Sequence, residues 1–144
     1  MKVVLDTNVL ARAHQKAQGP ARRILLHVIS GPDVHITSPY ILRELERVLS
    51  YPRLLKRSGL TSKDVAEYLD ILSALSCLVI PEAIPANVLR DAADTPILGT
   101  ALAGRAEVLC TRDADFYEQS VQRFCAANGI QVMTDLQFIN AFKI

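Results

Sequence analysis

The stretch KVVLDTNVLA (Lys2–Ala11) decides the fold class, because an apolar run typical of a buried strand stops abruptly at polar residues. Residues 3–5 form a continuous hydrophobic run of the kind found in strands that are covered on both faces. Asp6-Thr7-Asn8 then either turns the chain and caps a helix, or Asp6 is one wall of a cation site. The cation site requires other acids to reach the same place.

Composition predicts one globular domain over residues 1–144, because half of the residues are hydrophobic and 22% are charged. The N-terminal residues lack the pattern of a signal peptide, and no apolar run approaches the ~20 residues of a membrane span. Cys77, Cys110 and Cys125 show neither zinc spacing nor a disulfide framework. We therefore expect a cytoplasmic protein with no membrane partner, with reduced cysteines in its core.

The net charge of +1 does not indicate a nucleic-acid partner, but the charged residues are unevenly distributed along the chain. Residues 20–57 carry seven Lys or Arg against three acids, whereas residues 58–107 carry three against seven. This asymmetry is typical either of a basic rim beside an acidic centre or of ordinary solvated helix faces.

Short apolar strands alternate with helical patterns along the whole chain. Ser38-Pro39 is a typical helix start, Thr61 with Asp64 resembles a capping box, and Thr134 is the expected cap of the last helix. Strands are expected at residues 3–5, 34–37, 77–80, 108–111 and 130–133, and helices at about 7–16, 21–30, 39–50, 62–75, 96–104, 117–128 and 134–143, with a basic connector at 53–60. This alternation predicts an α/β fold, a three-layer α/β/α sandwich around a mainly parallel sheet of four to five strands.

Four acids fall at the strand-to-helix side of this predicted sheet: Asp6, Glu44, Asp94 and Asp113. Ligands of open parallel sheets bind at this edge, where the strand order reverses. Each acid also has a simpler structural explanation, namely helix caps for Asp6 and Asp94, a turn for Asp113, and an ion pair with Arg47 for Glu44. Glu44 favours the site, because a carboxylate that borders a buried apolar stripe is costly unless it is paired or bound to a metal.

A cluster of carboxylates needs a cation to neutralise it. Oxygen ligands without nearby Cys or His predict one or two Mg²⁺ or Mn²⁺ ions, which commonly serve phosphate chemistry by activating a water. Thr7, Asn8 and Thr111 are placed to orient that water or a carboxylate. The sequence contains no Ser-His-Asp set, Walker loop or GxGxxG motif.

Four segments, in this order and spacing, resemble PIN domains over essentially the whole chain. These are VVLDTNVLA, ITSPYILRELERVLSYPRL, RDAADTPILGTALAGRAEVLCTRDADF and IQVMT. They look closest to the bacterial and archaeal branch that contains toxin components of toxin–antitoxin systems (VapC-like). The resemblance implies a PIN-like fold, cleavage of single-stranded RNA with Mg²⁺ or Mn²⁺, a homodimer, and inhibition by a small antitoxin.

The resemblance also implies roles for individual residues. The family's four acids correspond to Asp6, Glu44, Asp94 and Asp113, its hydroxyl residues correspond to Thr7 and Thr111, and Asp91 and Asp115 are auxiliary candidates. One departure is Ala93, where members of this branch often have a further acid, so a supporting charge is missing.

Basic and aromatic residues provide candidates for RNA contact, with basic side chains along the backbone and Tyr51 stacked on a base. The candidates are Arg12, Arg43, Arg47, Tyr51, Arg53, Lys56, Arg57 and Arg112. Solvated basic helix surfaces explain the same residues equally well.

Two alternatives to the nuclease remain open at this point. An aspartyl-nucleophile phosphatase also has an Asp after the first strand and binds Mg²⁺ there, but its usual second Asp is replaced by Asn8. A receiver domain fits less well, because the third strand ends in IPEAI without an acceptor Asp. The second alternative is a PIN module that binds RNA or protein without cleaving it, against which four intact acids argue.

Overall fold

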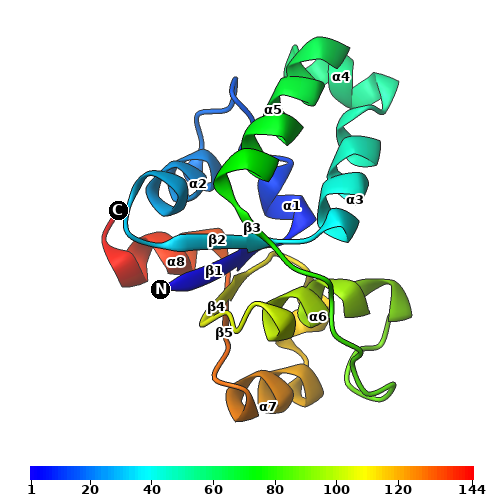
Figure 1. Ribbon diagram of the computed structural model, residues 1–144, viewed down its shortest axis with the longest axis vertical. Coiled ribbons are helices and arrows are strands. Elements are labelled where there is room, and N and C mark those ends of the chain that lie inside the picture. The colour runs from blue at the N-terminus through cyan, green and yellow to red at the C-terminus, as the bar shows by residue number, and fades with distance from the viewer.

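A five-stranded sheet forms the centre of the computed structural model, which describes residues 1–144 (Figure 1). All strand pairs are parallel, and the strand order is β3-β2-β1-β4-β5. The strands are β1 (Lys2–Leu5), β2 (Val34–Thr37), β3 (Cys77–Leu78), β4 (Val108–Cys110) and β5 (Gln131–Met133). The predicted fold class is thus confirmed, with β1 in the middle of the sheet.

The central position of β1 follows from its sequence. Val3, Val4 and Leu5 are completely buried, and β1 pairs with β2 on one side and β4 on the other. Strands with both faces covered have to be apolar throughout. The strand order reverses between β1 and β4, so the residues that follow these two strands border the crevice expected at such a reversal.

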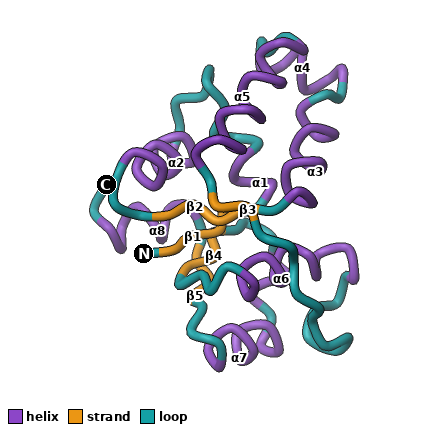
Figure 2. The backbone as a smooth tube through the Cα atoms, viewed as in Figure 1, coloured by secondary structure: helices purple, strands orange, loops and turns teal.

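Helices cover both faces of the sheet (Figures 1 and 2). One face carries α6 and α7, and the other carries α2, with α8 packed against α2. The pair α3 and α5 rises from the sheet, with α4 at its tip. The helices are α1 (Thr7–Leu10), α2 (Pro20–Ser30), α3 (Pro39–Leu49), α4 (Pro52–Ser58), α5 (Ser62–Leu75), α6 (Thr95–Ala103), α7 (Gln119–Ala127) and α8 (Asp135–Phe142), with 3₁₀ turns η1 (Ala92–Asp94) and η2 (Ala114–Tyr117).

Predicted capping residues begin three of these helices. The Ser38 side chain accepts from the Ile41 amide at the start of α3. Thr61 and Asp64 form the predicted capping box of α5, and Thr134 forms another at the start of α8. Such caps satisfy amide groups that the helix itself leaves without partners.

The structure corrects three predicted boundaries. The first helix ends at Leu10 instead of about Lys16, because the amides of Arg12 and Ala13 bond to carbonyls three residues back, a tighter turn that ends the helix. The basic connector, interpreted as a connector or as one more helical turn, forms the seven-residue helix α4. The helix expected at residues 117–128 is α7, which begins only at Gln119, because Tyr117 belongs to the 3₁₀ turn η2.

Strand β3 is the largest departure, because only two of the four residues expected in it pair with β2. It lies at the edge of the sheet, and both of its residues are exposed. Cys77 is therefore on the surface, contrary to the prediction, whereas Cys110 and Cys125 are buried free thiols. No helix is long and apolar enough to cross a bilayer.

Small residues let α6 approach the sheet closely. A Cβ on Gly104 would lie 2.3 Å from the Ile36 side chain in β2, and a Cβ on Gly99 would lie 2.2 Å from the Glu82 carbonyl oxygen. These approaches are shorter than any van der Waals contact allows, so glycine is required at both positions. The loop around Glu82 is thereby held against α6, and Asp94 stands at the start of the same helix.

Candidate active site

Asp6 lies at the floor of the crevice and is only 5% exposed. One of its carboxylate oxygens accepts from the Thr7 amide at 2.6 Å, and the other accepts from the Thr111 hydroxyl at 2.7 Å. Asp6 is therefore also the N-cap of α1, so the helix cap predicted for this residue is present together with its position in the crevice. Both oxygens are fixed in direction by these bonds.

Asn8 and Thr111 join the ends of β1 and β4. The Asn8 amide nitrogen lies 3.4 Å from both an Asp6 oxygen and the Thr111 hydroxyl, and its oxygen accepts from the Arg112 amide. The Thr111 hydroxyl also accepts from the Asp113 amide. These bonds set the backbone path that leads to Asp113. The buried Thr7 hydroxyl has no hydrogen-bond partner.

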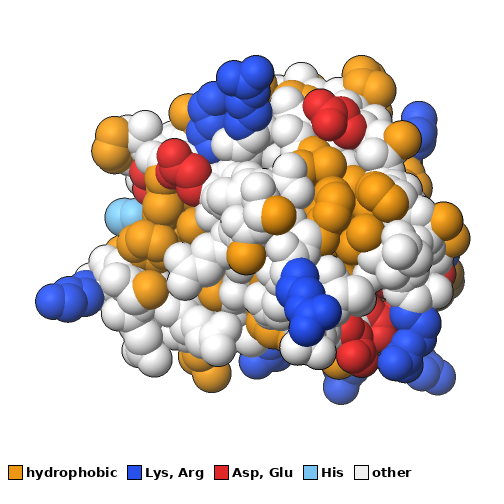
Figure 3. Space-filling model, turned by 90° about the horizontal axis from the view of Figure 1, so that it is seen from below, with side chains coloured by type: hydrophobic (Ala, Val, Ile, Leu, Met, Phe, Trp, Pro, Cys, Tyr) orange, Lys and Arg blue, Asp and Glu red, His pale blue; other side chains and the backbone are white.

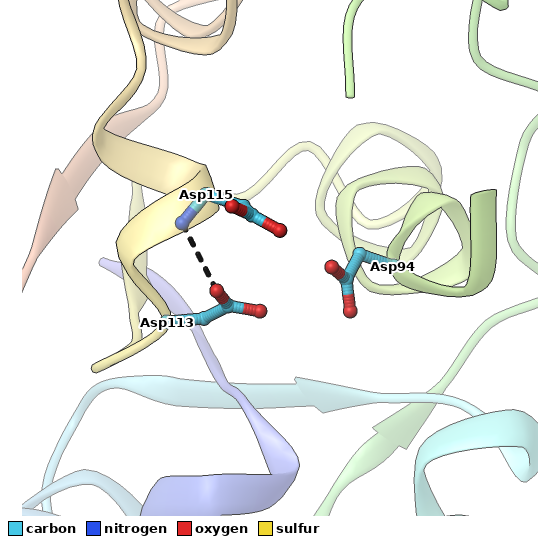
Figure 4. Close-up of side chains that lie close together, drawn as sticks. All are labelled: Asp94, Asp113 and Asp115. Carbon is cyan, nitrogen blue, oxygen red and sulfur yellow. Dashed lines mark hydrogen bonds between the residues drawn. The ribbon is translucent and has the colours of Figure 1, made fainter. Parts of the chain in front are cut away.

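Three carboxylates converge in the crevice above this floor: Asp94, Asp113 and Asp115 (Figure 4). One oxygen from each lies within 4.8 Å of the others. Asp94 stands at the start of α6 and faces the other two, of which Asp113 precedes η2 and Asp115 lies within it. Asp113 caps that turn by accepting from the Asp115 amide at 3.0 Å. These three residues are hereafter the aspartate triad.

Glu44 belongs to the same edge of the sheet but not to the aspartate triad. It is half-buried in α3, and its charge contributes to raising the pKa of Asp6. The predicted alternative of an ion pair with Arg47 is wrong, since no ion pair joins them. Arg47 instead donates to the Tyr51 hydroxyl at 3.0 Å.

Tyr40 connects the helix of Glu44 to the loop of Asp94. Its hydroxyl donates to the Ala93 carbonyl oxygen at 2.9 Å, immediately before Asp94. Asp91 is exposed and accepts from the Ala93 amide at 2.9 Å. Ala93 thus contributes its backbone to the site although it has no acid side chain.

The electrostatics of the crevice favour a cation. Burial raises the pKa of Asp6 to about 6, against hydrogen bonds from Thr111 and Thr7, and the charges of Glu44 and Asp113 raise it further. Burial, followed by the charges of Asp113, Asp91 and Asp6, raises the pKa of Asp94 to about 7. A cluster of carboxylates with no basic partner in its midst suits Mg²⁺ or Mn²⁺, which prefer hard oxygen ligands.

A second acidic group at this edge escaped the sequence analysis. Asp135, directly after β5, is 1% exposed and bonds Arg12 at 2.8 Å and Arg112 at 3.2 Å. Burial opposes ionisation, but Arg12 and Arg112 hold the pKa of Asp135 below its usual range. Residues that follow parallel strands meet at one edge of the sheet, and this reasoning, which located the other acids, applies equally to Asp135. From the sequence, Asp135 was interpreted only as part of a capped helix.

The remaining candidates for RNA contact lie on α3, on α4 and between them. Arg43, Arg47 and Tyr51 are exposed along α3, and Arg53, Lys56 and Arg57 are exposed on α4. A mostly apolar cavity of about 340 Å³ lies beside them, lined in part by Arg12, Leu54 and Arg57, but no acid of the crevice lines it. In the view of Figure 3, basic, acidic and apolar side chains are interspersed, and no single sign of charge dominates.

Comparisons with known proteins agree with this geometry. A PIN domain family model matches residues 2–115. The chain is 30% identical to the uncharacterized protein MJ1680 of Methanocaldococcus jannaschii over 146 aligned positions, which cover 99% of this chain and 92% of the relative.

A solved structure shares the fold. The crystal structure of VapBC2 from Rickettsia felis, bound to a DNA fragment from its promoter, matches with a TM-score of 0.56. The match has 16% sequence identity and covers 92% of this chain and 98% of the other. The family model spans most of the chain, including the segments that carry Asp6, Glu44 and the aspartate triad, and the chain belongs to the PIN domain family.

Proposed function

We propose that this protein is a metal-dependent endoribonuclease that cleaves single-stranded RNA. The observation that carries the proposal is the aspartate triad, whose oxygens lie within 4.8 Å of one another beside Asp6 and without a basic partner. Membership of the PIN domain family supports the same function, because PIN domains are typically nucleases.

The aspartate triad would hold the metal, with Asp6 and Glu44 adding negative charge from the floor and from α3. When bound, Mg²⁺ or Mn²⁺ supplies an activated water and stabilises charge on phosphate oxygens. Thr111 fixes the direction of Asp6 and the backbone of Asp113. Tyr40 ties the Asp94 loop to α3, which keeps acids from distant parts of the chain in one place.

The phosphatase alternative is weaker because its second acid is missing. An aspartyl-nucleophile phosphatase usually has a second Asp two residues after the nucleophile, which acts as acid and base. Asn8 occupies that position and cannot donate or accept that proton. Hydrogen bonds from Thr7 and Thr111 orient Asp6, which supports a positioning and charge role for this residue.

The biological setting belongs to the same proposal. The structural neighbour is a VapBC2 complex, and the sequence resembles VapC-like toxins. We assign this chain to the toxin side of such a pair, as a cytoplasmic homodimer that a small antitoxin protein inhibits. Co-expression with the product of any small reading frame that adjoins the gene, followed by copurification, tests that partner.

Cleavage of labelled single-stranded RNA in Mn²⁺ tests the activity. We expect cleavage that stops with EDTA and falls at least about a hundredfold in Asp113→Asn, because a ligand charge is lost. Asp70→Asn is the matched control, since Asp70 is an exposed acid of α5 without an ion pair. Equal cleavage by wild type and Asp113→Asn would exclude the proposed site, and phosphate release from small monoesters would favour the phosphatase.

A further inference from the structure

The outer face of α3 carries a groove that begins at the acidic crevice. One hollow of about 250 Å³ adjoins a second of about 390 Å³, and both are bordered by Arg43 and Arg47. The two together form the α3 groove, lined by Tyr40, Arg43, Glu44, Glu46, Arg47 and Ser50. The groove therefore runs along the length of α3, from the first turn of the helix to its end.

The near end of the α3 groove is part of the candidate active site. Glu44 lines the groove and also acts on the pKa of Asp6. Tyr40 lines it too, and its hydroxyl bonds the carbonyl next to Asp94. Two residues of the groove are thus tied to the crevice, Glu44 by its charge and Tyr40 by its hydrogen bond.

The arginines of the groove are free to bind an anion. Neither Arg43 nor Arg47 takes part in an ion pair, and both are exposed. Arg12 and Arg112, in contrast, are both held by Asp135. Of these four arginines, only Arg43 and Arg47 are therefore without an ion pair.

An aromatic ring marks the far end. Tyr51 follows α3 directly, is 47% exposed, and is oriented by the bond from Arg47 to its hydroxyl. Exposed tyrosine rings beside arginines are typical stacking platforms for unpaired bases, which offer a π-face and a phosphate together.

We infer that the α3 groove is the path by which single-stranded RNA approaches the acidic crevice, with backbone phosphates at Arg43 and Arg47 and a base stacked on Tyr51. The substrate class rests on the proposed function. Glu44 and Glu46 balance the two arginines in number, but Arg43 and Arg47 form no ion pair with them, and these unpaired guanidinium groups suit phosphate. The exposed ring favours a polyanion with aromatic bases over an acidic polypeptide.

Binding of a fluorescent single-stranded RNA oligonucleotide in EDTA tests the path without cleavage. Arg47→Ala should weaken binding about fivefold near 0.1 M salt and lower the salt slope by about 0.7, the value for one lost phosphate contact on a single strand. Arg123→Ala is the matched control, because Arg123 is exposed on α7, away from the groove, and has no ion pair. An equal loss in both variants, or none in Arg47→Ala, would overturn the path.

Tyr51 provides the second measurement. Tyr51→Ala should weaken binding about fivefold or more, whereas Tyr51→Phe keeps the ring and should bind as wild type does. Equal weakening by both variants would show that only the hydroxyl matters and would overturn the stacking. A polyglutamate peptide that competes as well as RNA, with the same dependence on Arg47, would identify an acidic polypeptide as the occupant and overturn the inference.

Cleavage kinetics separate this inference from the proposed function. If the protein cleaves RNA, Arg47→Ala should raise KM and leave kcat near its wild-type value, because the residue contacts substrate away from the reacting phosphate. RNA binding that depends on Arg47 in a protein without nuclease activity would leave the path standing and refute the nuclease. Cleavage with unchanged KM in Arg47→Ala would refute the path alone.

Discussion

Two groups of carboxylates at the same edge of the sheet are treated in opposite ways. Asp135 is almost fully buried and lies between Arg12 and Arg112, which hold its pKa below the usual range. The aspartate triad has no basic partner, and the pKa of Asp94 is raised to about 7. The first group is neutralised by the protein, and the second is left for a ligand.

The difference shows that the shortage of positive charge in the crevice is a local property. The chain has 16 Lys and Arg against 15 Asp and Glu, so basic residues are not scarce. Arg12 and Arg112 bind Asp135, and Arg43 and Arg47 line the α3 groove. Uncompensated charge at a functional site lowers the stability of the folded protein, and a cation that binds there raises it again.

The largest expected effect is on the neutralised group. Asp135→Ala should lower the free energy of unfolding by about 3 kcal/mol, because it removes the charge-assisted hydrogen bond from Arg12, the ion pair with Arg112 and the bond from the Leu136 amide. Urea denaturation measures this change. A loss below about 0.5 kcal/mol, the size typical of surface substitutions, would mean that solvent replaces the pair and that the two groups are not different in kind.

A divalent ion should act on the other group alone. Mn²⁺ at about a hundred times its Kd should stabilise the wild-type protein by about 2.7 kcal/mol. Asp113→Asn should lose most of this gain, since it removes a charged member of the aspartate triad, while Asp135→Ala should keep it. Thermal unfolding with and without Mn²⁺ gives both values, and a gain that survives in Asp113→Asn would place the ion elsewhere.

The smallest effect is one of pH. Asp94 has a raised pKa in the folded protein, so its contribution to stability is fully present below its ordinary value of 3.8 and is lost as the pH rises through about 7. In metal-free buffer, Asp94→Asn should therefore be more stable than wild type at pH 8, by about 1 kcal/mol after allowance for its partial exposure, and equal to it at pH 4.

The contribution of Asp135 has the opposite sign. Its pKa is lowered on folding, so its stabilisation is present above pH 3.8 and is lost as the pH falls through the lower value in the folded protein. Unfolding curves of Asp94→Asn and Asp135→Ala, recorded across this pH range, measure the two contributions. Parallel pH profiles for the two variants would contradict the contrast drawn between the groups.

Much of the fold was predictable, because it follows from short-range patterns. The apolar run Val3–Leu5 predicted a central strand, and the alternation of strands and helices predicted the parallel sheet. The parallel arrangement then predicted that Asp6, Glu44, Asp94 and Asp113 lie at one edge, which is where the structure places them.

The features that the sequence did not predict depend on the direction of side chains and on the position of a strand at the edge of the sheet. Asp115 was only an auxiliary candidate, and its place beside Asp94 and Asp113 depends on the 3₁₀ turn η2, which the sequence pattern did not predict. Asp135 meets Arg12 across more than a hundred residues, a contact that no local pattern encodes. The exposure of Cys77 follows from the short pairing of an edge strand, and an apolar run of four residues does not reveal how many of them pair.

The position of β1 between β2 and β4 has a consequence for how the protein is made. β2 follows β1 within the first quarter of the chain, but the other side of β1 has no neighbour until Val108–Cys110 has been synthesised. The aspartate triad spans residues 94 to 115, so it assembles only after β4 inserts. The acidic crevice of a nascent chain would therefore stay incomplete until residue 115 of the 144 has been synthesised.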